Sequence, residues 1–188
     1  MIRLYLDTSN QFIHIGLQED NVWLSKISQE AFKQQSELAM PMIEDLFKKY
    51  DLKTSQLSEV ILTIGPGSYT GIRIAMTISK VLGAIAGIPI YTLNTLHAIA
   101  GTEPTIMAMM DARANRAYTA IYDLGKEIQA PNITLVEEID FENKVTERDV
   151  DLLENMSNLK DYWTLVEDVH SLEPLYLKEN DQYGSNNQ

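Results

Sequence analysis

Glycines crowd the segment Gly65-Pro-Gly-Ser-Tyr-Thr-Gly71, which follows the short apolar run at residues 60–64. A glycine-rich turn between a strand and a helix is one way in which proteins hold phosphate, because backbone N–H groups close on the anion. The spacing differs from that of known phosphate motifs: Ile72 follows the last glycine where a P-loop has Lys-Ser/Thr, and a dinucleotide fingerprint needs Gly-x-Gly-x-x-Gly. Ser68 or Thr70 could instead cap a helix. We therefore favour a capped packing turn, with an anion site as the alternative.

Two aspartates end two similar apolar runs. Asp7 closes residues 3–7 and Asp111 closes residues 106–111, and an alternating run follows each of them. Two carboxylates that face each other across a cleft could serve in acid–base chemistry. A hairpin turn that binds phosphate after a strand-end aspartate has the form Asp-x-Gly-x-Thr, because glycine lets backbone N–H groups close on the anion. Here the turn reads Asp7-Thr-Ser-Asn10 and has no glycine. We favour a second role, in which each aspartate accepts hydrogen bonds as an Asx-type turn cap.

Metal and thiol chemistry have little support in the composition. The chain has no cysteine, and its three histidines, at positions 14, 97 and 170, are far apart in sequence. A metal site on one helix would need two histidines four residues apart, and no such pair occurs. The sequence therefore predicts no catalytic residue, no cofactor and no metal.

A repeated order of elements would position these residues. The patterns predict strands at residues 3–7, 12–17, 22–28, 60–64, 106–111, 117–122 and about 162–166, with helices over 32–50, after the glycine turn and over 145–156. Three strands, a helix, a strand and a helix, begun again near residue 104, are the plan of the actin-like and sugar-kinase (ASKHA) folds. We predict an α/β fold of duplicated βββαβα domains, residues 1–103 and 104–188, with a reduced second domain.

The charge of the chain is uneven. Of the 188 residues 45% are apolar, and the net charge of −12 falls mostly in residues 137–188, which carry 14 acidic and 4 basic side chains. An acidic surface repels phosphate backbones, so we expect no independent binding of nucleic acid. No segment approaches the roughly 20 apolar residues of a membrane span, and Asp7 interrupts the first apolar run. We expect a cytoplasmic protein without membrane contact.

The helix after the glycine turn is apolar on more than one side. Small residues recur at every fourth position along one ridge, and larger apolar residues line the neighbouring face. One face can pack against the rest of the chain, and the other face can then bind a partner. The helix over 32–50 adds an apolar band, with a kink expected at Pro41. We predict a two-helix partner surface made of Leu38, Met42, Ile43, Leu46, Phe47, Tyr69, Arg73, Ile74, Ala75, Ile78, Ser79 and Leu82.

Several short motifs fit one family pattern. They are Leu4-Tyr-Leu-Asp-Thr-Ser9, Ser36-Glu-Leu-Ala-Met-Pro-Met-Ile43, Gly65-Pro-Gly-Ser-Tyr-Thr-Gly-Ile-Arg73, Gly87-Ile-Pro-Ile90, Thr95-Leu96, Asp111-Ala-Arg113 and Pro174-Leu-Tyr-Leu177. With these motifs the chain resembles the TsaB family, also called YeaZ. The first 125 residues carry most of the resemblance, and Arg116 stands where the family pattern has a glutamate.

The resemblance implies a function without chemistry of its own. Members of the family are non-catalytic subunits of the bacterial machinery that makes threonylcarbamoyladenosine in tRNA. It also implies that the two-helix surface packs against the like surface of the catalytic subunit TsaD, that the ATPase subunit TsaE joins through TsaD, and that isolated chains form homodimers. Two other classes stay open, an ATP-dependent small-molecule kinase that uses Asp7 and Asp111, and a glycoprotease-type metallopeptidase.

Overall fold

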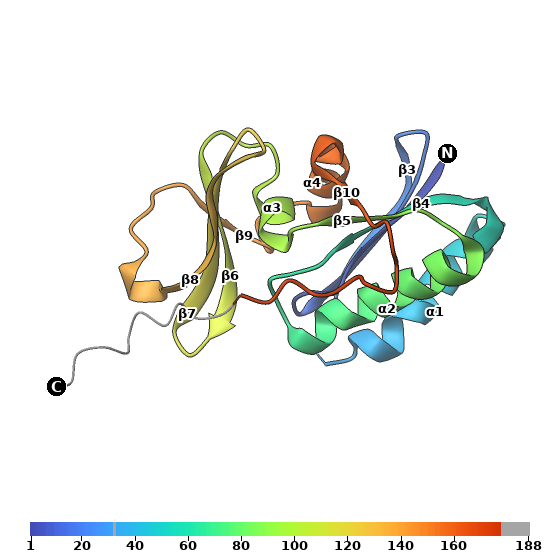
Figure 1. Ribbon diagram of the computed structural model, residues 1–188, viewed down its shortest axis with the longest axis horizontal. Helices are drawn as coiled ribbons and strands as arrows, with labels where there is room; N and C mark the ends of the chain where they lie inside the picture. Colours follow the sequence, from blue (N-terminus) through green and yellow to red (C-terminus); the bar gives the residue numbers. More distant parts are fainter. Residues whose placement is uncertain (32, 178–188) are drawn as a thin grey trace.

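Two β-sheets lie side by side along the long axis of the computed structural model, which describes residues 1–31 and 33–177 (Figure 1). The first sheet has the order β10-β5-β4-β1-β2-β3 and the second β8-β7-β6-β9. The strands are β1 (Ile2–Asp7), β2 (Phe12–Glu19), β3 (Val22–Glu30), β4 (Leu57–Thr63), β5 (Ile90–Leu93), β6 (Ile106–Arg113), β7 (Arg116–Asp123), β8 (Lys126–Leu135), β9 (Lys144–Thr146) and β10 (Thr164–Leu165). The helices are α1 (Gln35–Lys49), α2 (Tyr69–Ala86), α3 (Thr95–Ala100) and α4 (Leu152–Asn158).

Both sheets follow the same plan. In the first, β1 pairs antiparallel with β2 and parallel with β4, and β4 pairs parallel with β5. Parallel neighbours need a crossover connection, which α1 and α2 supply. In the second, β6 pairs antiparallel with β7 and parallel with β9. The predicted α/β fold with an actin-like duplication is therefore confirmed, and the second copy is reduced because the connection from β8 to β9 contains only a 3₁₀ turn, Val136–Glu138.

The helix predicted over residues 145–156 was wrong in its first half. Lys144–Thr146 forms β9, and the helix begins only at Leu152, after Asp151 caps its first turn. The backbone N–H and the hydroxyl of Thr146 both donate to Asp149, at 2.8 and 2.7 Å. Such local side-chain bonds compete with helix formation and hold a turn between the two elements. The long strand β8 was not predicted either.

The boundary between two domains at residues 103 and 104 stays a prediction. Strands β6 to β9 form the second sheet, as that boundary would have it, but β10 returns to the edge of the first sheet and pairs with β5. Residues 178–188 of the second predicted domain lie outside the described residues. We call the first sheet with α1 and α2 the first lobe, and the second sheet the second lobe.

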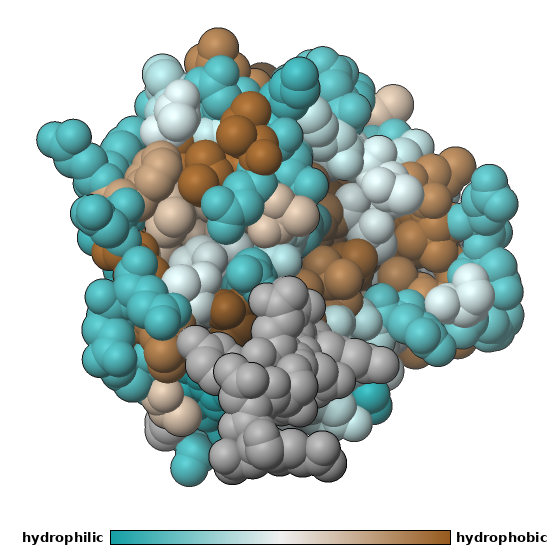
Figure 2. All heavy atoms as spheres, turned by 60° about the vertical axis from the view of Figure 1, so that its left-hand side comes forward, coloured by the Kyte–Doolittle hydropathy of each residue, from teal (hydrophilic) through white to brown (hydrophobic). Residues whose placement is uncertain are grey.

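Apolar side chains form two cores on opposite faces of the first sheet. One core joins that sheet to α1 and α2 through residues such as Leu4, Leu46 and Ile72. The other lies between the two sheets and includes Tyr5 and Ile61 together with α3 and α4. On the face shown in Figure 2, by contrast, hydrophilic side chains separate several apolar patches. The second core fixes where the lobes meet.

The small ridge of α2 faces this chain's own sheet. A Cβ atom at Gly71 would lie 2.1 Å from the carbonyl oxygen of Thr8, and Ala75 and Ser79 are fully or almost fully buried. A Cβ atom at Gly83 would lie 2.8 Å from Val169. Small side chains here let the helix approach the sheet closely. None of the described helices is long and apolar enough to cross a membrane.

Candidate functional site: an interlobe cleft and the outer face of α2

The glycine turn joins β4 to α2 by close backbone packing. The Ser68 hydroxyl oxygen accepts a hydrogen bond from the backbone N–H of Gly71 at 3.2 Å, which confirms the predicted cap. The backbone N–H of Ser68 donates to the carbonyl oxygen of Ser9 at 2.6 Å. A Cβ atom at Gly67 would lie 2.4 Å from that same oxygen, so only glycine fits there. The turn therefore packs against the β1–β2 turn.

Both strand-end aspartates act as turn acceptors. Asp7 is fully buried and accepts from the backbone N–H of Ser9 at 3.3 Å, from its hydroxyl at 2.7 Å, from Asn10 at 3.5 Å and from the Thr63 hydroxyl. Asp111 is exposed and accepts from the backbone N–H of Arg113 at 2.8 Å. The preference for Asx-type turn caps is confirmed at both positions.

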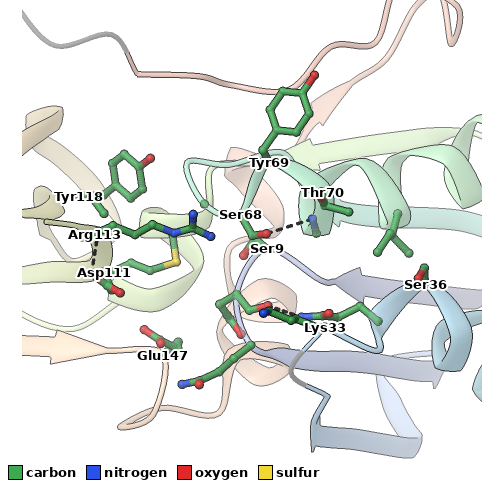
Figure 3. A pocket seen from close by; sticks show the side chains of 18 residues that line it. Ser9, Lys33, Ser36, Ser68, Tyr69, Thr70, Asp111, Arg113, Tyr118 and Glu147 are labelled. Carbon is green, nitrogen blue, oxygen red and sulfur yellow. Dashed lines mark hydrogen bonds between the residues drawn. The ribbon is translucent and has the colours of Figure 1, made fainter.

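A cleft of about 660 Å³ opens between the lobes (Figure 3). The first lobe contributes the β1–β2 turn, the segment before α1 and the start of α2, and the second lobe contributes the ends of β6 and β7 with Glu147. Asp111 lines the cleft, whereas Asp7 is not among its lining residues. Those residues are Ser9, Asn10, Gln11, Lys33, Gln35, Ser36, Gly67, Ser68, Tyr69, Thr70, Gly71, Ile74, Met110, Asp111, Ala112, Arg113, Tyr118 and Glu147.

Four ionisable side chains in the cleft carry two positive and two negative formal charges: Lys33, Arg113, Asp111 and Glu147. Burial raises the pKa of the Glu147 carboxyl, and the negative charges of Asp7 and Asp111 add to this, against the opposing effects of a backbone N–H and Arg148. The two carboxylates therefore repel each other in a partly desolvated place. The cleft is a mixed-charge site rather than a uniformly basic one.

The outer side of α2 presents a stripe of exposed residues at four-residue intervals. This outer stripe consists of Tyr69, Arg73, Thr77, Val81 and Ile85, all exposed, with Ile85 at 82%. The Arg73 guanidinium lies 4.2 Å from the ring centroid of Tyr69, and its Nε–H donates to the Tyr176 hydroxyl at 2.8 Å. The two tyrosine rings stack at 5.4 Å. An ordered aromatic and cationic cluster therefore stands at one end of an otherwise aliphatic stripe.

Comparison with known proteins shows to which family the chain belongs. The family described as "TsaD: tRNA N6-adenosine threonylcarbamoyltransferase" matches residues 26–147. The tRNA threonylcarbamoyladenosine biosynthesis protein TsaB of Bacillus subtilis is 32% identical over 126 residues, 65% of this chain and 55% of that one. This chain belongs to the TsaB/YeaZ family. It spans about half the length of the Bacillus relative. It is also 27% identical to the uncharacterized protein MG208 of Mycoplasma genitalium, over 94% of this chain and 95% of that one.

A solved member of the TsaB/YeaZ family has the same fold. YeaZ from Pseudomonas aeruginosa superposes with a TM-score of 0.78 over 94% of this chain and 99% of that chain, at 18% identity. The likeness at this identity concerns the arrangement of the elements alone. It agrees with the βββαβα plan described above.

The two-helix partner surface predicted from the residue patterns is only partly exposed. Five of its members are buried in the chain's own core, namely Ile43, Leu46, Ala75, Ile78 and Ser79. Five others pack half-buried against that core, namely Leu38, Met42, Phe47, Ile74 and Leu82. Only Tyr69 and Arg73 are exposed. The predicted surface lacks Thr77, Val81, Ile85 and Tyr176, although a count by fours from Tyr69 leads to the first three.

The histidines lie in unrelated places. His14 on β2 hydrogen-bonds to the Ser28 hydroxyl at 2.9 Å, and His97 on α3 to the carbonyl oxygen of Gly125 at 2.7 Å. Burial lowers the pKa of both imidazoles, although Asp7 and Asp151 oppose this at His14. Within residues 1–31 and 33–177, no group of three or more histidine, cysteine, aspartate or glutamate side chains could hold a metal ion.

Proposed function

We propose that this chain is a non-catalytic subunit of the machinery that makes threonylcarbamoyladenosine in tRNA, and that it works in the cytoplasm by binding the catalytic subunit TsaD. Its membership of the TsaB/YeaZ family supports the pathway. Its role is that of a scaffold, which holds TsaD in a competent state and lets the ATPase subunit TsaE join through TsaD. In the absence of TsaD the same surface pairs two copies of the chain.

The observation that carries the scaffold role is the outer stripe of α2. Val81 and Ile85 are 51% and 82% exposed, although their helix is otherwise packed against the first sheet. Tyrosine and arginine are enriched among the residues that contribute most to protein interfaces. The Tyr69–Arg73–Tyr176 cluster is already ordered, so little side-chain entropy is lost when a partner binds.

Two local features favour a non-catalytic role over the kinase alternative. The carboxylate of Asp7 accepts hydrogen bonds from Ser9, Asn10 and Thr63, so a ligand or metal would compete with those donors. The glycines at positions 67 and 71 stand against backbone oxygens of this chain, where a phosphate cradle would leave them open to a ligand. Turnover by the isolated chain that Asp111→Ala abolishes, with folding retained, would overturn the non-catalytic assignment.

The test is complex formation with the catalytic subunit from the same cell. We expect the purified chain to form a complex with TsaD on a sizing column with mass detection, and Ile85→Asp to weaken it at least about tenfold by burying an unpaired charge. Ile128→Asp on β8 is the matched control, because Ile128 is 58% exposed on the other lobe. Equal effects of the two substitutions, or no complex with the unaltered chain, would contradict the proposal.

A further inference from the structure

Both cations of the cleft have a left-handed backbone conformation. Lys33 has φ +61° and Arg113 has φ +66°. Residues with a side chain seldom adopt this region, and when they do the cause is often a functional constraint. Arg113 lies at a register shift of the β6–β7 pair, next to the two-residue turn Ala114–Asn115. Such a bulge redirects a side chain away from the normal alternation of a strand.

The redirected side chain of Arg113 points into the cleft. Figure 3 shows it extending from the β6–β7 turn toward Ser68 on the opposite lobe. Its backbone N–H bonds to Asp111, but within the described part of the chain its guanidinium makes no hydrogen bond or ion pair. Guanidinium N–H groups bind carboxylate oxygens in pairs, so this side chain is equipped to hold an anionic group that the cleft admits.

The carboxylates of Asp111 and Glu147 provide negative charge in a part of the cleft away from the guanidinium of Arg113. In Figure 3, Asp111 and Glu147 lie together on the side of the second lobe, and Lys33 lies on the side of the first. Burial and the charge of Asp111 act against ionisation of Glu147. A cationic ligand group between the two carboxylates would relieve their repulsion, whereas a polyphosphate would add to it.

We infer that the interlobe cleft binds a small zwitterion of the amino-acid class, with its carboxylate at Arg113 and its ammonium group between Asp111 and Glu147. The volume of about 660 Å³ lies in the range of small-molecule sites. Hydroxyl and amide side chains, among them Ser36 and Gln35, line much of the rest of the cleft and suit a polar ligand, beside the apolar side chains of Ile74 and Met110. The inference is independent of the scaffold role, because Tyr69 is the one residue of the outer stripe that also lines the cleft, and the stripe contains neither Arg113 nor the two carboxylates.

The first experiment uses the unaltered chain. Isothermal titration with each of the free L-amino acids is followed by titration with two analogues of the tightest binder, the acid that lacks the ammonium group and the amide that lacks the carboxylate. We expect each analogue to bind at least about tenfold more weakly, because each loses one charge-assisted contact. Equal binding of amino acid and analogues, tighter binding of AMP or magnesium ATP, or no heat with any amino acid at about 10 mM would overturn the inference.

Variants then locate the site. Arg113→Met should weaken the amino acid at least about tenfold and leave the weak binding of the amide unchanged, whereas Glu147→Gln should affect the amide and spare the deaminated acid. Lys144→Met is the control, since Lys144 is exposed on β9 in the same lobe and does not line the cleft. Circular dichroism checks that each variant folds. Unchanged affinity in a folded Arg113→Met chain would place the ligand elsewhere and overturn the inference, whatever the outcome of the TsaD experiment.

Discussion

The buried side chain of Asp7 stabilises the β1–β2 turn at the edge of the cleft through its hydrogen bonds. Asp7 is a buried carboxylate that accepts from three neighbouring residues, and it ties the β1–β2 turn to Thr63 on β4. Its place at a strand end was predicted from the sequence, and the role of turn cap was favoured there over acid–base chemistry. Its bond to Thr63 could not be predicted, because that contact joins residues far apart in the chain.

Replacing Asp7 by asparagine should lower the free energy of unfolding by about 2 kcal/mol, because an amide turns an N–H₂ group toward donors that need an acceptor. Urea denaturation measures the effect. Asp111→Asn is the control, since Asp111 is exposed and accepts a hydrogen bond from the backbone N–H of Arg113. Equal destabilisation by the two substitutions would show that the burial of Asp7 contributes nothing.

His14 makes the stability depend on pH. Burial holds its pKa below the ordinary value of 6.5, and Asp7 and Asp151 only partly offset this. The unfolded chain therefore binds more protons than the folded one as the pH falls below about 6.5, and the folded state loses stability there. His97 shifts in the same direction. We expect the free energy of unfolding to fall between pH 7.5 and 5.5.

The substitution His14→Gln should reduce that fall in urea titrations at a series of pH values, because glutamine does not titrate. His170→Gln, at an exposed position outside the core, controls for the change of residue type. If His14→Gln leaves the slope of stability against pH as it was, the folded and unfolded chains bind the proton at this residue equally well.

Helix α2 shows what periodicity can and cannot reveal at the scale of an element. The sequence displayed its small ridge and its apolar face, but the spacing of residues gives the angle between two faces and not which of them meets the sheet. The small ridge faces inward because it packs closely against the carbonyl oxygen of Thr8 and the side chain of Val169. Both groups are distant from α2 in sequence. In the same way, the pairing of β9 with β6 turned residues 144–146 from the predicted helix into a strand.

Ala75→Leu should therefore destabilise the chain, because Ala75 is 1% exposed on the buried side of α2 and overpacking costs about 1 to 3 kcal/mol. The melting temperature should fall. Thr77→Leu, two positions along on the exposed side of the same helix, should leave it nearly unchanged. An unaltered melting temperature in Ala75→Leu, combined with loss of self-association, would return the small ridge to the role of an interface.

The whole molecule combines an acidic surface with contacts that join helix α4 to the first lobe. Lys26 on β3 pairs with Asp151 at 2.5 Å and Glu154 at 3.0 Å, and Trp23 donates to Glu154 at 2.8 Å. Gln18 donates to the Ser157 hydroxyl at 3.0 Å. The plan of two related sheets was predictable from the repeated motifs, but these bridges and the cleft between the lobes depend on how the two halves dock.

The net charge of −12 leads to a prediction for the isolated protein. We expect no measurable binding of tRNA at physiological salt, because an acidic surface repels the phosphate backbone. Filter binding at about 0.05 and 0.15 M salt is the measurement, with the proposed complex with TsaD for comparison. Tight binding by the chain alone at the higher salt would contradict the prediction and show a local basic site that outweighs the net charge.

Strand β10 determines when the first sheet can be completed during synthesis of the chain. β5 is hydrogen-bonded to β4 on one side, and its other side is closed by Thr164, Leu165 and the backbone N–H of Val166, which donates to Ile90 at 2.9 Å. A nascent chain must therefore pass through all four strands of the second sheet before the first sheet is complete. Until then β5 presents an open edge of the kind to which other strands add. The half of the protein that leaves the ribosome first can therefore complete its sheet only after the strands of the second sheet have been synthesised.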